Sequence, residues 1–167
     1  LKIKPESLVM IDLWGRVNKK GAPFADITAM GYLGKNIPAE ILKVFDIIKN
    51  ARDKAVAYLK ENIKRGKMPT GFEIDAIARN YIKKYGFGDN FLHGLGHPLG
   101  FTNPHGAGVR LSPKFKKPLS KMVGYTIEPG IYLKNKPPHL GCGARGNYIK
   151  SVGHSRCGGK FGVRSEI

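Results

Sequence analysis

The sequence has few cysteines, few acidic residues and no long apolar run. Two cysteines among 167 residues predict no disulfide framework and make a reducing, cytoplasmic location the default. No apolar segment approaches the roughly 20 residues that a membrane-spanning helix needs, so we expect no membrane partner. The first residues lack a signal-peptide cleavage site, and the chain starts at Leu1 and enters a strand pattern almost at once. We therefore expect a processed chain or a fragment.

The scarcity of acidic residues leaves a large positive charge. Lysine and arginine total 29 against 12 aspartates and glutamates, which gives a net charge of +17. Such a balance suggests phosphate binding. However, the basic residues are scattered and do not alternate with aromatic residues in a stripe, so we interpret them as a solvated surface and consider a nucleic-acid partner unfavoured. A hydrophobic content of 41% predicts a folded single domain over residues 1–167.

The first half of the chain alternates from strand to helix patterns. Residues 7–15 form a continuous apolar run typical of a buried strand, and residues 24–34 alternate like a second strand joined to it by a hairpin-like connection. Apolar residues at helical spacing predict a helix over residues 38–65 with Gly66 just past its end. A capping box of Thr70 and Glu73 opens a second helix, which should stop at Gly86.

The second half of the chain is predicted to consist of strands and turns. The pattern over residues 122–133 predicts a strand, a Pro-Gly break and another strand, and that over residues 161–167 predicts a last strand. Between them, residues 134–160 are rich in glycine, proline and lysine. We predict a loop insertion there.

Four carboxylates stand inside these strand patterns, where an isolated charge is costly to bury. Taken singly, each could form a salt bridge with one of the many basic residues or lie at an exposed edge. Together with one histidine, they form a ligand set dominated by oxygen, which suits two divalent ions such as Mn²⁺ or Co²⁺ better than one structural zinc. The five candidates are Asp12, Asp26, His97, Glu128 and Glu166.

The order of the motifs resembles a known family. The segments "IDLWG", "FADIT", "FLHGLGHPLG", "HGAG", "TIEPGIYL" and "GVRSE" follow one another as in the M24 metallopeptidases, which include methionine aminopeptidase, aminopeptidase P and prolidase. The resemblance implies an α+β pita-bread fold, here a partial catalytic domain with two helices packed on a curved, mostly antiparallel sheet. It also implies that the same five residues are the metal ligands, in the family's order of Asp, Asp, His, Glu and Glu.

The resemblance further implies an activity. It predicts hydrolysis of peptide bonds near the amino terminus by a metal-bridging hydroxide, and "GVRSE" resembles the branch that acts on Xaa-Pro bonds. Glu128 would shuttle a proton, His93 and His105 would contact substrate, and Arg164 would orient Glu166 or bind substrate. The expected cofactors are two divalent ions, Mn²⁺ first and Co²⁺ or Zn²⁺ next. The expected partner is a peptide substrate, while a homodimer and the choice between aminopeptidase and dipeptidase stay open.

Two other interpretations remain at this point. The chain could be a catalytically inactive pita-bread module that binds protein or RNA through its basic surface. Separately, two H-x2-C half-motifs have a spacing that a structural zinc could use, although an exposed loop with free thiols is the simpler interpretation. The residues of these half-motifs are His139, Cys142, His154 and Cys157.

Overall fold

The structure, a computed structural model, describes residues 2–133, 141–143 and 146–148. Within them, two helices separate a long amino-terminal hairpin from four short strands near the carboxyl end. In chain order the elements are β1 (Ser7–Gly15), β2 (Ala25–Leu33), α1 (Ala39–Lys64), α2 (Gly71–Lys84), the 3-10 turn η1 (Gly88–Asn90), β3 (Tyr125–Ile127), β4 (Gly130–Tyr132), β5 (Gly141–Gly143) and β6 (Gly146–Tyr148).

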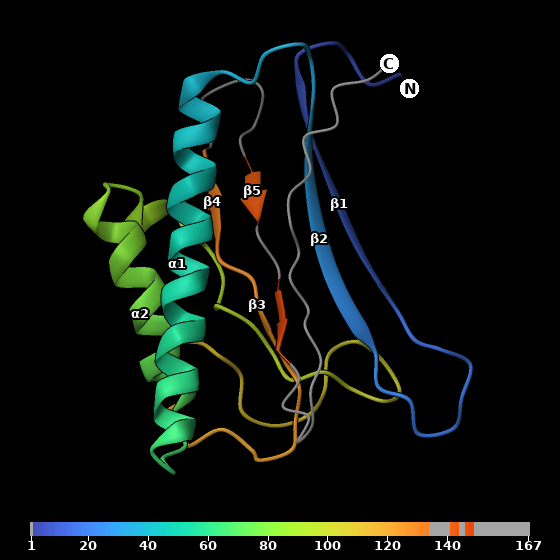
Figure 1. Cartoon of the computed structure of the whole chain (residues 1–167), viewed down its shortest axis with the longest axis vertical. Coiled ribbons are helices and arrows are strands. Elements are labelled where there is room, and N and C mark those ends of the chain that lie inside the picture. The colour runs from blue at the N-terminus through green and yellow to red at the C-terminus, as the bar shows by residue number, and fades with distance from the viewer. Residues whose placement is uncertain (1, 134–140, 144–145, 149–167) are drawn as a thin grey trace.

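The helices and the strands form two layers. All three strand pairs are antiparallel: β1 with β2, β3 with β6, and β4 with β5. Helix α1 packs against α2 on one side and against β3, β4 and β5 on the other, while β1 and β2 lie on the side away from α2 (Figure 1). Two helices packed on antiparallel strands form the α+β arrangement that the family resemblance implied, and that expectation is confirmed.

Helix α1 has the boundaries that its sequence pattern predicted. It begins directly after Pro38, whose missing N–H costs nothing at a helix start, and it ends at the cap residue Arg65. Gly66 follows with φ of 74°, the left-handed conformation that only glycine adopts cheaply. The buried side chains recur every three or four residues and therefore line one face of the helix: Ile41, Val44, Ile47, Ile48, Ala51, Ala55 and Leu59.

The predicted capping box at the start of α2 is present in full. The Thr70 hydroxyl accepts a hydrogen bond from the Glu73 N–H at 3.1 Å, and the Thr70 N–H donates to Glu73 Oε2 at 2.7 Å. The hydrogen bonds from the backbone and the hydroxyl of Thr70 lower the pKa of Glu73 below its ordinary value of 4.5. The helix stops before Gly86, which has φ of 85°.

Strand β1 has the predicted bounds, but the prediction that it is buried is wrong for the described residues. Its only described ladder partner is β2, and Ile11, Leu13 and Trp14 are 53%, 55% and 58% exposed. In β2, by contrast, Asp26 and Met30 are buried on one face, as the alternation predicted. A continuous apolar run does not reveal how many neighbours cover a strand, because that depends on the rest of the sheet.

The predicted strand, break and strand over residues 122–133 correspond to β3, Glu128–Pro129 and β4. The region 134–160, predicted as a loop insertion, includes the short strands β5 and β6. The rest of that region and the predicted strand 161–167 lie outside the described residues, so the insertion stays a prediction. Among the described residues, no helix combines the length and the apolar character that crossing a membrane requires.

The capping box yields a stability prediction. Replacing Thr70 with alanine should lower the free energy of unfolding by about 1 kcal/mol at neutral pH, because the Glu73 N–H loses its acceptor. Since the folded state lowers the pKa of Glu73, the stabilisation from its ionised form is present above pH 4.5 and is lost as the pH falls through the lowered value. The alanine variant keeps the backbone hydrogen bond to Glu73 Oε2 and loses only that from the hydroxyl. The difference between the two proteins, measured by urea unfolding from pH 7 to pH 3, should therefore shrink at the acid end but not vanish.

Thr102→Ala is the matched control, because Thr102 is an exposed threonine outside the helices. Its free energy of unfolding should change by less than about 0.5 kcal/mol. A Thr70→Ala protein as stable as the control variant would show that the capping box contributes nothing.

Candidate metal centre

Three of the five predicted ligands meet inside the protein. Asp26 comes from β2, Glu128 directly follows β3, and His97 lies in the glycine-rich segment between them in sequence. Their exposed fractions are 1%, 5% and 8% for Asp26, His97 and Glu128, and one ligand atom from each lies within 4.8 Å of the others. His97 Nε2 is 3.3 Å from Asp26 Oδ2 and 3.6 Å from Glu128 Oε1.

Backbone pairing sets the positions of His97 and Glu128 relative to each other. The Thr126 N–H donates to the His97 carbonyl at 2.9 Å, and the His97 N–H donates to the Thr126 hydroxyl at 3.0 Å. The Glu128 N–H donates to the Leu95 carbonyl at 2.8 Å. Residues 95–97 therefore run beside residues 126–128 like a neighbouring strand, and this pairing presents both candidate ligands to the same interior position.

Gly96 makes this pairing possible. A Cβ atom at this position would lie 2.0 Å from the Thr126 carbonyl oxygen, well inside van der Waals contact. The close approach at Gly96 is to the backbone of β3, and this contact requires a residue without a side chain.

The hydrogen bonding of the His97 ring defines which nitrogen faces the carboxylates. Nδ1 is 3.0 Å from the Pro98 carbonyl, which can only accept, so Nδ1 carries the proton. Nε2 is then directed at Asp26 and Glu128. A ligand histidine is commonly held in this way, with one ring nitrogen donating to a carbonyl and the other available to a metal.

The chemistry of the three side chains fits a divalent cation. Two carboxylates that are buried together repel each other, and burial makes each charge expensive unless a cation compensates it. One imidazole with two carboxylates is a mostly hard donor set, of the kind that Mn²⁺, Co²⁺ and Zn²⁺ accept. The arrangement can therefore hold a metal ion and place it beside groups that transfer protons.

Asp12 lies on the same face of the hairpin but outside the three-residue cluster. It pairs across the ladder with Thr28, whose hydroxyl donates to Asp12 Oδ1 at 3.1 Å, and Thr28 is two residues from Asp26. Because side chains two residues apart share a face, Asp12 and Asp26 are diagonal neighbours. Asp12 is exposed. Its role as a metal ligand stays a prediction.

Two further predicted site histidines lie near the cluster or its supporting segment. The ring centroid of His105 is 4.3 Å from that of His97. His93 Nε2 is 2.9 Å from the Tyr132 hydroxyl, and the two rings meet edge to face. Both histidines are exposed, which is compatible with contact to a substrate.

Some predicted site residues lie outside the described part of the chain, and two residues that contact the site histidines were not predicted. Glu166, Arg164, His139, His154 and Cys157 lie outside the described residues, as does the side chain of Cys142, so the second glutamate ligand, the arginine and the zinc knuckle all stay predictions. Thr126 and Tyr132 were not predicted as site residues from the sequence. Both stand in apolar strand patterns where a hydroxyl needs a buried partner, and this was the available signal.

The comparisons with known proteins agree on one family. The sequence model of metallopeptidase family M24 matches residues 1–166. The Xaa-Pro dipeptidase of Pyrococcus furiosus is 35% identical over 141 residues, which cover 84% of this chain and 36% of that protein. The curated relative is thus nearly three times as long as the region that matches.

Solved structures show the same similarity in the fold. A dipeptidase from Pyrococcus horikoshii superposes with a TM-score of 0.75 at 27% identity, covering 93% of this chain and 40% of that one. An X-Pro aminopeptidase from Thermotoga maritima gives a TM-score of 0.72 at 27% identity, covering 88% and 38%. These are pita-bread enzymes, and the described part of this chain has the same fold.

The close approach at Gly96 yields a second prediction. Gly96→Ala should force residues 95–97 away from β3 and lower the free energy of unfolding by about 1–3 kcal/mol or more, since neither backbone can move without breaking hydrogen bonds. Urea unfolding followed by circular dichroism measures the change.

Gly31→Ala is the matched control, because a Cβ atom there would meet nothing within 4 Å. Alanine in a strand interior loses less chain entropy than glycine, so this variant should be as stable as the parent protein or slightly more stable. Equal stability of the two variants would refute the steric role of Gly96.

Proposed function

The chain belongs to metallopeptidase family M24, and we propose that its centre of Asp26, His97 and Glu128 binds divalent metal for the hydrolysis of Xaa-Pro peptide bonds. The observation that carries the proposal is the convergence of two carboxylates and one imidazole in the interior of a chain with a net charge of +17. In such a basic protein, surface carboxylates have many cationic partners. Two carboxylates that are buried together beside a histidine repel each other, and a bound metal ion would compensate both charges.

The full proposal includes two metal ions. Asp12 and Glu166 would complete a set of five ligands. The register of Asp12 with Thr28, which puts Asp12 on the same face of the hairpin as Asp26, supports this role for Asp12. Mn²⁺ is the preferred ion, with Co²⁺ and Zn²⁺ as alternatives. When bound, the ions would supply a Lewis acid and lower the pKa of water to near neutrality.

The residues of this chain would then have separate roles. Glu128 would accept a proton from the attacking water and deliver it to the leaving nitrogen. His105, whose ring lies against that of His97, would donate to the substrate carbonyl oxygen, and His93 would also contact the substrate. Arg164 would orient Glu166 or bind the substrate.

The substrate class rests on the relatives. The relative described above carries the name Xaa-Pro dipeptidase, and one of the similar structures is an X-Pro aminopeptidase. We therefore propose a peptide with proline in the second position. With two cysteines in the chain, a cytoplasmic location is part of the same proposal.

Metal binding is the first test. Isothermal titration of the full chain with Mn²⁺ should show saturable binding, and each of Asp26→Asn, His97→Ala and Glu128→Gln should weaken it at least tenfold, because each removes one donor. Binding should also raise the free energy of unfolding, by about 2.7 kcal/mol at a free metal concentration of 100 times Kd.

Asp46→Asn is the control for the loss of a carboxylate. Asp46 is an exposed residue of α1, and its Oδ1 atom lies 3.7 Å from Nζ of Lys49. Its replacement should leave the affinity for Mn²⁺ unchanged. If the parent chain gives no heat of binding and no stabilisation by Mn²⁺, Co²⁺ or Zn²⁺, the metal centre is disproved.

Hydrolysis is the second test. The chain loaded with Mn²⁺ should release the amino-terminal residue from Ala-Pro or from Ala-Pro-Ala, as measured by liquid chromatography, and Glu128→Gln should reduce the rate at least a hundredfold because the proton acceptor is lost. Cleavage of the dipeptide alone would indicate a dipeptidase, whereas cleavage of the tripeptide would indicate an aminopeptidase. Metal binding without any cleavage would favour the inactive module with a basic surface.

A further inference from the structure

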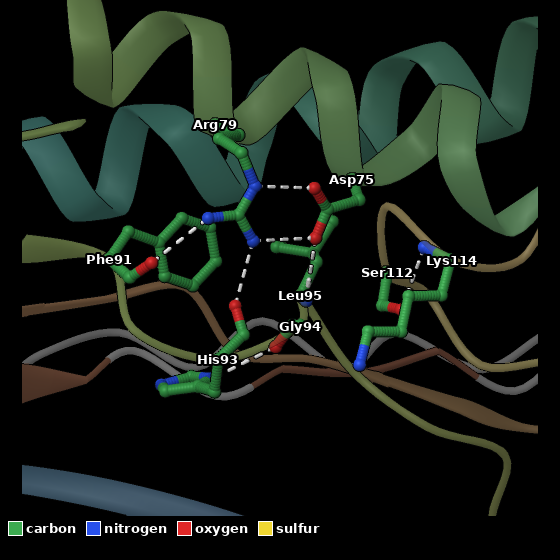
Figure 2. Close-up of polar contacts among 8 residues, drawn as sticks. All are labelled: Asp75, Arg79, Phe91, His93, Gly94, Leu95, Ser112 and Lys114. Atoms are coloured by element: carbon green, nitrogen blue, oxygen red, sulfur yellow. Dashed lines mark hydrogen bonds and ion pairs between the residues drawn. The ribbon is translucent and has the colours of Figure 1, made fainter. Parts of the chain in front are cut away.

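A nearly buried ion pair on α2 lies beside the segment that carries the site histidines. Asp75 is 1% exposed and the Arg79 side chain is 26% exposed. The pair is bidentate: Arg79 Nε donates to Asp75 Oδ2 at 2.7 Å, and Arg79 Nη2 donates to Asp75 Oδ1 at 3.0 Å (Figure 2). An ion pair of this burial differs from the solvated i, i+4 pairs that add little to a helix.

The remaining donors of Arg79 hold the backbone of the glycine-rich segment. Nη1 donates to the Phe91 carbonyl at 2.9 Å, and Nη2 donates to the His93 carbonyl at 2.7 Å. Figure 2 shows the guanidinium between the Asp75 carboxylate and these two carbonyl groups. One rigid side chain therefore fixes two alternate residues of a segment that has no regular secondary structure of its own.

Arg79 also acts on the His93 ring through Phe91. The guanidinium carbon of Arg79 lies 4.2 Å from the centroid of the Phe91 ring, within the range of a cation–π interaction. The Phe91 ring in turn meets the His93 ring edge to face, with centroids 5.3 Å apart. The backbone and the ring of His93 thus both depend on the position of Arg79, and this position allows the contact of His93 with Tyr132.

Asp75 connects the same pair to the metal centre. The Leu95 N–H donates to Asp75 Oδ1 at 3.0 Å, while the Leu95 carbonyl accepts from the Glu128 N–H at 2.8 Å. Leu95 is fully buried and stands two residues before His97. A single residue, Leu95, therefore joins the carboxylate of Asp75 to the backbone of a proposed metal ligand.

From these contacts we infer that Arg79, held by its ion pair with Asp75, is a positioning residue for His93. Neither side chain is among the three that converge on the proposed metal position. The inference rests on the proposed function only for its effect on catalysis, since the placement of His93 can be measured without metal or substrate. Lysine cannot replace Arg79, because an ammonium group lacks the planar fork that reaches a carboxylate and two carbonyls at once.

The test uses Arg79→Lys in the full chain. The charge that pairs with Asp75 is kept, so the circular dichroism spectrum should be unchanged. The nuclear Overhauser contacts between the His93 and Tyr132 rings should be lost in the metal-free protein. In the metal-loaded enzyme, kcat for the Xaa-Pro substrate should fall about 10–100-fold, as for other residues that orient a functional group, while the affinity for Mn²⁺ stays within about twofold.

Arg65→Lys is the matched control, because Arg65 forms an exposed ion pair with Glu61 four residues earlier. Nε of Arg65 lies 2.8 Å from Oε1 of Glu61. This variant should leave both the ring contacts and kcat unchanged. Retention of the His93–Tyr132 contacts in folded Arg79→Lys would overturn the inference, whether or not the chain hydrolyses peptides. If the parent chain itself has no activity, the proposed function is rejected. Loss of the His93–Tyr132 contacts in Arg79→Lys would still support the positioning role in that case.

Phe91→Leu covers the case in which Arg79→Lys does not fold. This variant keeps the ion pair and its two carbonyl contacts but removes the ring between Arg79 and His93. The His93–Tyr132 contacts should be lost in the folded variant, and their retention there would refute the transmission of Arg79's position through Phe91.

Discussion

The burial of Asp26 and Glu128 beside His97 is the constraint on which the rest of the described structure depends. Two carboxylates that share an interior site repel each other and have lost much of their hydration. The backbone must therefore hold them firmly, and the site must offer a compensating cation. The first requirement is met by the hydrogen bonds of residues 95–97 to 126–128. The second is the reason that we propose a metal ion at the position toward which Nε2 of His97 is directed.

The support for this site extends in layers from the strands to α2. The short strand β3 cannot fix the position of Glu128 alone, because three residues make few ladder bonds. Pairing with residues 95–97 adds bonds from the other side, and Gly96 allows the two backbones to approach. Hydrogen bonds with Asp75 and Arg79 then hold this segment against α2, whose first turn is capped by Thr70 and Glu73. The positions of the site residues therefore depend on helix α2, which lies outside the site.

Prediction from the sequence succeeded where the signal was local. Three such features each depend on a few adjacent residues: the capping box, the glycines that follow both helices, and the break at Pro129 between β3 and β4. The exposure of β1 was missed, because an apolar run cannot reveal whether a strand has one neighbour or two. The Asp75–Arg79 pair was also missed. A buried acid four residues before an arginine could have suggested the pair, but nothing local could have predicted the carbonyls that it holds.

The sequence by itself determined the helices, the strand that carries Asp26, and the residue types and order that identify metallopeptidase family M24. These are properties of the chain that act over a few residues or match a family pattern in order. Only the tertiary structure decided which of the predicted ligands lie close together. It placed Asp26, His97 and Glu128 within 4.8 Å of one another and left Asp12 at an exposed diagonal position. The physical reason is that convergence depends on strand register and close backbone approach between distant segments, which no local pattern encodes.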